Sequence, residues 1–261
     1  MLKTRFFTAV AALIVVAIVL FAIPSLYAEF IIGLLMLAGA WEWSGLIDKD
    51  KTALRAVYTA ILGACLAFAH TASPGQAALI MQVACVWWLI AFLWTLRFPT
   101  PIPAAVRWIC GLLVIVPLFV ALYTLLRLGV EYLIAVLFIV WFADGGAYFA
   151  GKAFGRVKLA PAISPGKTWE GVVGGLVLVA ALAIVVGLWQ RLDIAVLLPF
   201  FLAVAAISIV GDLTVSMFKR TAGVKDSGAL FPGHGGVLDR VDSVAAASPL
   251  FALGLKALGI A

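Results

Sequence analysis

Apolar stretches of nearly membrane-spanning length alternate with short polar connections along the whole chain. An α-helix needs about 20 mainly apolar residues to cross a bilayer, because each residue adds only about 1.5 Å of length. Nine stretches approach this length: residues 6–23, 30–47, 54–69, 77–96, 107–126, 132–150, 171–190, 194–215 and 244–260. The pattern therefore predicts an all-α polytopic membrane protein with about nine transmembrane helices.

The composition agrees with this prediction. Of the 261 residues, 66% are hydrophobic and 11% are charged, and the mean hydropathy is +1.20. A soluble domain carries about 45–50% apolar and about 25% charged residues, so this chain has too few charges to cover a water-exposed surface. Intrinsic disorder is excluded as well, because it requires low hydrophobicity and high charge.

The positions of Lys and Arg predict the orientation in the membrane. If the N-terminus lies in the cytoplasm, 15 of the 18 cationic side chains fall on the cytoplasmic side. Only Arg127, Arg191 and Lys256 fall on the opposite side. Cytoplasmic loops carry an excess of Lys and Arg, so this distribution supports a cytoplasmic N-terminus and an odd number of spans.

Two polar regions interrupt the apolar pattern, and both lie on the predicted cytoplasmic side. Residues 144–170 and 212–242 hold 14 of the 30 charged side chains. We therefore expect residues 1–130 to be N-terminal transmembrane helices that embed the protein and offer surfaces for dimer contacts. Residues 131–261 would form the catalytic region, with cytoplasmic loops at 151–170 and 216–243. The polar active site is expected in this C-terminal half.

The first polar region combines a carboxylate with a basic loop. Asp144 lies near the end of an apolar stretch, and an ionised carboxylate at membrane depth normally faces a partner, a cavity or an ion. The segment 164–171 predicts a Pro-Gly turn that leads into the seventh span. A helix N-terminus attracts anions, and Ser164, Lys167 and Thr168 would reinforce such a site. The same residues also fit a loop that only anchors the chain to anionic lipids.

The second polar region places three kinds of polar side chain on one helical stripe. Asp212, Ser216 and Lys219 are spaced i, i+4 and i+7, which puts them on one face of an α-helix. Asp239 precedes the last apolar stretch. Because Mg²⁺ is commonly held by one or two carboxylates and substrate phosphates, Asp212 and Asp239 are candidate metal ligands.

A glycine-rich loop joins these two candidate ligands. Glycines at 233, 235 and 236 flank His234, and glycine permits positive φ angles and a close approach of the backbone to a ligand. Lys219, Arg220, Lys225 and Arg240 are available to neutralise phosphates. An acid–base network that merely ties two helices together is the alternative. His234 either donates to a phosphate or forms a structural hydrogen bond.

Two features outside the polar regions have open interpretations. Glu42 lies between Trp41 and Trp43 in the second apolar stretch. It either reaches the lipid phosphate or an ion, or it is a carboxylate with structural partners. Gly174 and Gly175 indicate close helix packing, within the chain or between two copies.

The polar regions resemble a known signature. The segment Ser216-x2-Lys-Arg-x4-Lys-Asp-x-Gly-x3-Pro-Gly-His-Gly-Gly-x2-Asp-Arg-x-Asp242 is similar to that of the phosphatidate cytidylyltransferases, also called CDP-diacylglycerol synthases. The blocks Asp144-x3-Tyr-x2-Gly-Lys-x2-Gly155 and Ser164-Pro-x-Lys-Thr-x-Glu-Gly171 match that family in the same order. The resemblance covers the whole chain in length and hydropathy, and its motifs lie in the C-terminal half. It implies a membrane enzyme that joins CTP to phosphatidic acid and releases pyrophosphate.

The resemblance also implies roles for individual residues. We expect catalytic roles for Asp144, Asp212, Lys219 and Asp239. We expect substrate contacts from Ser164, Lys167, Thr168, Ser216, Arg220, Lys225, His234 and Arg240. Asp212 and Asp239 would hold Mg²⁺ or Mn²⁺, and Asp144 would be a third ligand or a carboxylate behind the ligands. A second, monovalent cation is left open.

The expected partners are CTP, phosphatidic acid and membrane lipids, with no nucleic acid, and a homodimer is left open. The expected location is the bacterial inner (plasma) membrane, with the N-terminus and the active site in the cytoplasm. One alternative is a related transferase that acts on another lipid phosphate or a polyprenol. A transporter of ions or phosphate is the non-enzyme alternative, but many transporters have two related halves. Here the polar residues are concentrated after position 144.

Overall fold

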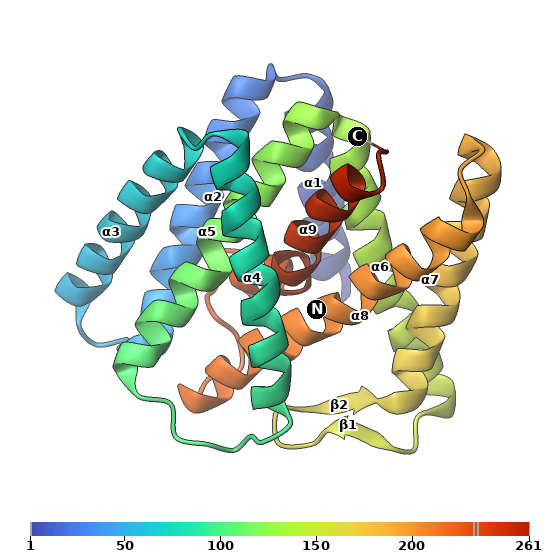
Figure 1. Cartoon of the computed structure of the whole chain (residues 1–261). Coiled ribbons are helices and arrows are strands. Elements are labelled where there is room, and N and C mark those ends of the chain that lie inside the picture. Colours follow the sequence, from blue (N-terminus) through green and yellow to red (C-terminus); the bar gives the residue numbers. More distant parts are fainter. Residues whose placement is uncertain (1, 232, 234, 261) are drawn as a thin grey trace.

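Helices make up most of the chain in a computed structural model that describes residues 2–231, 233 and 235–260 (Figure 1). The described residues contain nine helices, which follow the nine predicted stretches in order. They are α1 (Leu2–Phe21), α2 (Ser25–Ile47), α3 (Thr52–His70), α4 (Pro74–Thr95), α5 (Ala104–Leu128), α6 (Val130–Phe154), α7 (Trp169–Gln190), α8 (Ile194–Thr221) and α9 (Leu238–Ala257).

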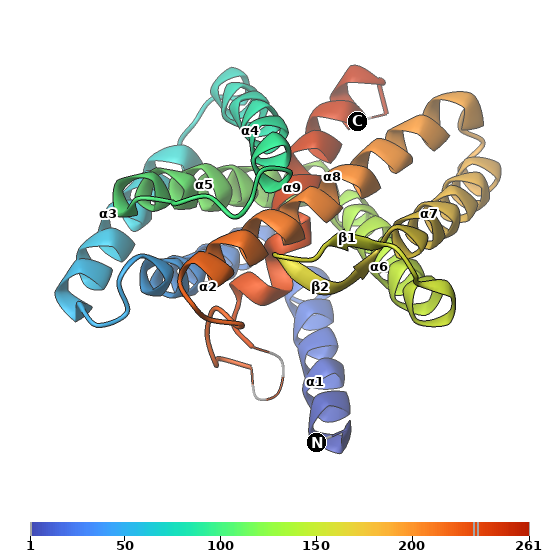
Figure 2. The ribbon, with the colours of Figure 1, turned by 90° about the horizontal axis from the view of Figure 1, so that it is seen from below.

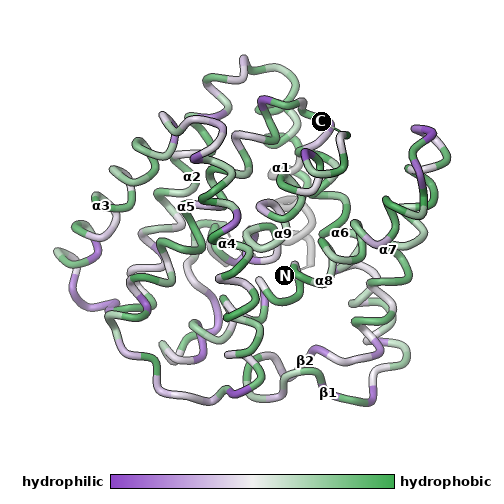
Figure 3. The backbone as a smooth tube through the Cα atoms, viewed as in Figure 1, coloured by the Kyte–Doolittle hydropathy of each residue, from purple (hydrophilic) through white to green (hydrophobic). Residues whose placement is uncertain are grey.

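Seven of these helices, α2 to α8, are long and apolar enough to cross a membrane. The chain is therefore a multi-pass membrane protein, as predicted. Figure 3 shows that hydrophilic residues gather mainly at the helix ends and in the connections, while the helix bodies are apolar. The crossing of α1 and α9 stays a prediction. The first turns of α9 contain Asp239, Arg240 and Asp242, which lower its apolar character.

The helices form two groups on either side of a central pair. In Figures 1 and 2, α8 and α9 run through the middle, with α2 to α5 on one side and α6 and α7 on the other. α9 packs against α5 and α4 as well as α8, so it lies between the groups. Trp43, Tyr58, Trp88 and Phe218 are among the largest fully buried side chains. The second polar region spans the end of α8 and the start of α9, so it lies where the two groups of helices meet.

A short β-hairpin replaces part of the first predicted loop. Strands β1 (Lys158–Ala160) and β2 (Ser164–Thr168) pair antiparallel. The expected Pro-Gly turn at 165–166 is wrong, because those residues lie inside β2. The chain instead reverses at Pro161, where the amide of Ile163 donates to the carbonyl of Ala160 at 3.1 Å. Proline at the second position favours such a turn, and an edge strand tolerates a proline.

The loops are shorter than expected because helices extend into both polar regions. α6 continues to Phe154 and α8 to Thr221, so the connections are residues 155–168, which include the hairpin, and residues 222–237. The last turn of α8 contains Lys219 and Arg220, and the first turn of α9 contains Asp239. Cations stabilise a helix C-terminus and anions a helix N-terminus, so these charged residues favour helix at the end of α8 and at the start of α9.

Glycines allow α6 and α7 to pack with their backbones in close contact. A Cβ atom at Gly146 would lie 2.7 Å from the carbonyl oxygen of Gly174, and one at Gly175 would lie 2.6 Å from that of Ala143. No side chain fits at either position. Gly174, predicted together with Gly175, also faces α6, so the close packing predicted for these two glycines is confirmed within the chain. The contact holds Asp144, on α6, close to the hairpin.

Candidate active site

The predicted polar stripe is present on the C-terminal part of α8. The hydroxyl of Ser216 donates to Oδ1 of Asp212 at 3.1 Å, and Lys219 lies one turn further along. Lys219 is buried, with 6% of its surface exposed. A buried ammonium group is costly unless carboxylates neutralise it, so its neighbours decide how the site works.

Lys219 pairs with two carboxylates of α9. Its Nζ lies 2.7 Å from Oδ1 of Asp239 and 3.9 Å from Oδ2 of Asp242. The side chains of Lys219 and Asp239 are 8% and 6% exposed, so water screens their attraction only weakly. The pair joins α8 to α9 at the end of the bundle where the glycine-rich loop begins.

A second ion pair joins the two polar regions. Nζ of Lys167, on β2, lies 2.5 Å from Oδ2 of Asp212, on α8. Asp144 is within electrostatic range of both groups, and Asp242 also interacts with both. Two lysines and four carboxylates, counting Asp239, therefore form one charged cluster, which combines β2 with α6, α8 and α9. We call it the charged cluster below.

The glycine-rich loop wraps around the carboxylate of Asp239. Oδ2 of Asp239 accepts hydrogen bonds from the amides of Ser227 and Gly236, both at 2.9 Å, and its distance to the Ser227 hydroxyl is 3.0 Å. The positive φ predicted for the glycines is confirmed at Gly233 (76°) and Gly235 (77°). A Cβ atom at Gly235 would lie 2.6 Å from the Asp239 carboxylate, so glycine is required by space as well as by conformation.

Glu42 extends the same network from α2. Its Oε1 accepts from the amide of Val237 and its Oε2 from that of Leu238, both at 2.9 Å. The Ser227 hydroxyl lies 2.9 Å from Oε2. Of the two interpretations left open by the sequence, these contacts favour the carboxylate with structural partners.

Two of the predicted substrate-binding residues have structural contacts at the hairpin and its ends. Arg220 donates to the carbonyl oxygens of Ile163, at 3.0 Å, and Val224, at 3.1 Å. The hydroxyl of Thr168 accepts from the amide of Gly171 at 3.2 Å and so caps the N-terminus of α7. Their predicted substrate contacts stay predictions.

The remaining predicted residues have no side-chain contact with the charged cluster among the hydrogen bonds and ion pairs of the described residues. Lys225 and Arg240 are exposed, and Ser164 begins β2 with partial exposure. His234 lies outside the described residues, so its predicted role stays a prediction.

The carboxylates differ in how well they fit a divalent cation. Asp212 is 25% exposed and Asp144 is exposed, and carboxylate oxygens together with substrate phosphates suit Mg²⁺. Both oxygens of Asp212 and both of Asp239 have hydrogen-bond or ionic partners, so a metal would have to displace Lys167 at the first and Lys219 at the second. The difference is exposure, because the Asp239 side chain is only 6% exposed. Among the described residues, no three His, Cys, Asp or Glu side chains are grouped as a protein-only metal site. The arrangement suits an ion that shares its coordination with phosphates.

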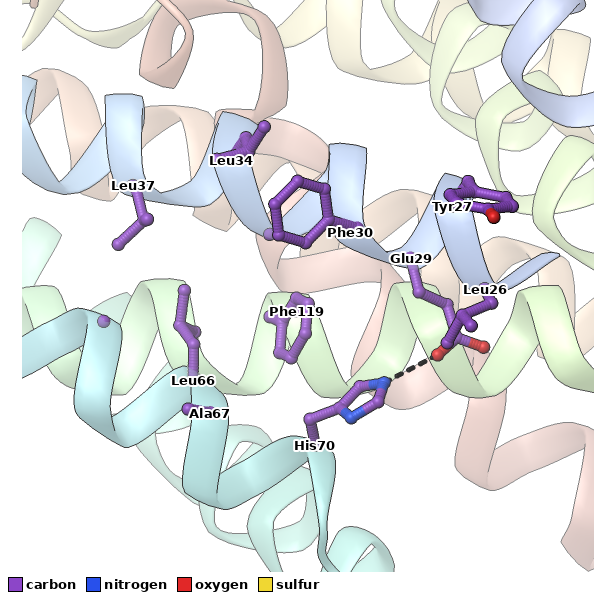
Figure 4. Close-up of a pocket in the computed structure, with 12 residues that line it drawn as sticks. Leu26, Tyr27, Glu29, Phe30, Leu34, Leu37, Leu66, Ala67, His70 and Phe119 are labelled. Carbon is purple, nitrogen blue, oxygen red and sulfur yellow. Dashed lines mark hydrogen bonds and ion pairs between the residues drawn. The ribbon is translucent and has the colours of Figure 1, made fainter. Parts of the chain in front are cut away.

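A separate polar cluster lies at the other end of α2, beside a cavity of about 640 Å³ (Figure 4). Glu29, which is 4% exposed, accepts two hydrogen bonds of 2.7 Å from Arg127, and its Oε2 lies 2.7 Å from Nε2 of His70. Leu34, Phe119 and other apolar side chains line the rest of the cavity. This cluster joins α2, α3 and α5 and is distinct from the charged cluster.

From the sequence, neither Ser227 nor Asp242 was assigned a role. Ser227 had no signal beyond its place in the loop. Asp242 lies three residues after Asp239 and therefore on the same helix face, which was a usable signal.

Comparison with known proteins extends beyond the polar regions. The profile of the cytidylyltransferase family matches residues 3–258. A phosphatidate cytidylyltransferase of Pseudomonas aeruginosa is 43% identical over 268 aligned residues, which cover 99% of this chain and 98% of the relative. The enzyme of the same name from Haemophilus influenzae is 36% identical, with 96% and 97% covered. One from Staphylococcus aureus is 45% identical over 124 residues, which cover 47% of this chain and 48% of the relative. The two longer similarities include the N-terminal helices.

Proposed function

This chain belongs to the cytidylyltransferase family, and we propose that it makes CDP-diacylglycerol and pyrophosphate from CTP and phosphatidic acid. The observation that carries the proposal is the charged cluster, in which Lys167 pairs with Asp212 and Lys219 pairs with Asp239. A reaction between two phosphate-bearing anions needs cations that hold them together. The similarity to the Pseudomonas aeruginosa enzyme over 99% of the chain supports the same substrates.

In the proposed reaction, a phosphate oxygen of phosphatidic acid attacks the α-phosphorus of CTP. The new oxygen–phosphorus bond forms as the bond to the β-phosphate breaks, and pyrophosphate leaves in line with the attack. A phosphate monoester has a second pKa near 6, so the lipid phosphate is mostly dianionic near neutral pH. The enzyme therefore needs no strong general base, and its task is to position and neutralise the two anions.

The charged cluster can both position and neutralise the two substrate anions. Lys167 and Lys219 exchange their carboxylate partners for phosphate oxygens, and the exposed Lys225 and Arg240 add positive charge at the edge. Asp212, with Asp144 nearby, would hold the divalent cation. Bound Mg²⁺ or Mn²⁺ would supply positive charge for the phosphate oxygens and the leaving pyrophosphate. Asp239 would be available as the predicted further ligand if Lys219 paired with a phosphate instead.

The cytoplasm is the proposed source of CTP, with the bacterial inner membrane as the location. Fifteen of the 18 Lys and Arg residues lie on the side that carries the charged cluster if the chain alternates across the membrane. Phosphatidic acid would then reach the site laterally from the bilayer, and membrane lipids would surround the apolar faces of the helices.

The direct test uses purified protein in detergent with Mg²⁺, CTP and phosphatidic acid. We expect CDP-diacylglycerol and pyrophosphate in equal amounts. Parallel reactions with dCTP, UTP or ATP, and with other lipid or polyprenyl phosphates, distinguish this reaction from that of a related transferase. Folded protein that makes no product from CTP and phosphatidic acid would contradict the proposal.

A further inference from the structure

We propose that Glu42 of α2 is a positioning residue for the active-site loop, residues 222–237, and so makes the N-terminal half of the chain a part of catalysis. The proposal rests on the proposed function, because it assigns Glu42 an effect on that reaction. It goes further by giving α2 a role beyond embedding the protein in the membrane.

The first observation is that Glu42 caps α9 from a distant part of the chain. α9 has no side-chain cap of its own at its N-terminus. The carboxylate of Glu42 accepts from the amides of Val237 and Leu238, although these residues are 195 and 196 positions away. The first amides of a helix lack partners within the helix, and a negative charge there also interacts favourably with the helix dipole. Glu42 therefore fixes where α9, and with it Asp239, begins.

The second observation is that the loop is shaped around Glu42. A Cβ atom at Gly228 would lie 2.5 Å from Oε1 of Glu42, and one at Gly236 would overlap the same carboxylate. Glu42 is 7% exposed, so the loop covers it almost completely. Side chains at these two positions would push the loop away from α2.

The third observation is that Ser227 links Glu42 to the charged cluster. Its hydroxyl lies 2.9 Å from Glu42 and 3.0 Å from Asp239, and it can donate its one proton to only one of them at a time. Asp239 already accepts from two amides and pairs with Lys219, so the hydroxyl is free to donate to Glu42. Glu42 thus acts on Lys219 through Ser227 and Asp239, without touching it.

The neighbouring residue strengthens the connection between α2 and α8. The Trp43 ring packs against that of Phe218, with centroids 5.0 Å apart, and Phe218 directly precedes Lys219. The indole of Trp43 also donates to the carbonyl oxygen of Arg107 at 2.8 Å. Both rings are fully buried, so this contact fixes the position of α2 relative to the end of α8 that contains Lys219.

The test compares Glu42→Gln and Glu42→Ala with Glu29→Gln. Glu29 is a matched control because it is also a buried carboxylate on α2, but its partners are Arg127 and His70, outside the loop. We expect kcat/KM to fall about tenfold in Glu42→Gln and further in Glu42→Ala, as when buried amides lose their acceptor. Glu29→Gln should lower thermal stability but leave kcat/KM within about twofold, because its contacts are not part of the network.

Hydrogen–deuterium exchange provides a readout that a general loss of stability would not produce. In Glu42→Gln we expect faster exchange in residues 222–237 and in the first turn of α9, with unchanged exchange in α6 and α7. Ser227→Ala should have a smaller effect of the same kind. Its combination with Glu42→Gln should cost less than the two separate effects together, because both act through one network.

Three results would overturn the proposal. They are wild-type kcat/KM in Glu42→Ala, an equal loss in Glu29→Gln, or lost activity with wild-type exchange in the loop. If Glu42→Ala does not fold, Ser227→Ala and Glu42→Gln supply the same comparison. The exchange measurement does not depend on turnover, so a wild-type protein inactive on CTP would contradict the proposed function while still testing the contact between Glu42 and the loop.

Discussion

Lys167 lies 2.5 Å from Asp212, and this ion pair joins the hairpin to α8. The two side chains are 27% and 25% exposed, so both are accessible to a ligand while they neutralise each other. A phosphate could pair with Lys167 in place of Asp212, and a divalent cation could pair with Asp212 in place of Lys167. Both side chains would then still face an opposite charge. We therefore expect this ion pair to open when substrate binds.

Replacing Lys167 should reduce phosphate binding and activity but leave the protein folded, because the side chain is partly exposed. We expect Lys167→Met to lower kcat by about 10²-fold, because removing one group that stabilises transition-state charge typically has such an effect. Initial rates with labelled CTP measure this change. Lys158→Met, at an exposed lysine on β1, is the matched control and should keep its activity. Full activity in Lys167→Met would contradict a role in phosphate binding.

Replacing Lys219 should reduce stability as well as activity. Lys219→Met leaves Asp239 and Asp242 without their cation, and breaking a buried ion pair costs about 3–5 kcal/mol. Unfolding in mixed micelles measures the change. Lys256→Met, at an exposed lysine in the last turn of α9, should behave like the wild type. The double variant Lys219→Met/Asp239→Asn should recover part of the lost stability, and no recovery would argue against the pair.

Removing divalent cations should stop turnover. We expect chelation with EDTA to abolish activity and added Mg²⁺ or Mn²⁺ to restore it. The carboxylates of the charged cluster are negative like the triphosphate, so a cation is needed between them. Asp212→Asn should require about tenfold more Mg²⁺ for half-maximal rate, which corresponds to about 1.4 kcal/mol. Asp50→Asn, at an exposed connection, should leave the Mg²⁺ requirement unchanged. Repeating the titration with K⁺ or Na⁺ present tests the monovalent cation, and activity that survives EDTA would rule out the metal.

Two adjacent glycines of α6 should respond in opposite ways to alanine. A Cβ atom at Gly146 would meet the backbone of α7, whereas one at Gly145 has no heavy atom within 4 Å. Gly146→Ala should therefore destabilise the protein by about 1–3 kcal/mol through overpacking. Gly145→Ala should stabilise it by up to about 1 kcal/mol, because alanine favours helix. Thermal unfolding of the two variants provides the measurement, and equal midpoints would contradict the close α6–α7 contact.

Much of the fold could be predicted because a bilayer demands long apolar helices, which leave a clear pattern. The stripe of Asp212, Ser216 and Lys219 followed from helical spacing alone. The hairpin could not be predicted in the same way, since Pro165 and Gly166 favour turns locally. Their place in β2 depends on pairing with β1, where Lys158 faces Thr168 and Ala160 faces Ser164.

The sequence predicted which charged residues would gather, but not which of them would pair. The high density of charged residues in 144–170 and 212–242 indicated that the site would lie in these two regions. The spacing along the chain could not show that Lys167 faces Asp212, or that Asp239 is enclosed by Ser227 and Gly236. Such contacts depend on how helices from distant segments cross. The role of Glu42 was left open for the same reason.

The distance of Glu42 from α9 along the chain has a consequence for biosynthesis. At about 5–20 residues per second, the ribosome needs about 10–40 s to add the 195 residues between Glu42 and Val237. During this time the helix that caps the final segment is already made, but its hydrogen-bond donors do not yet exist. A chain released just before the last helix would contain α1 to α8 but neither Asp239 nor Asp242 of the charged cluster. We therefore expect such a truncated product to be inactive rather than partly active.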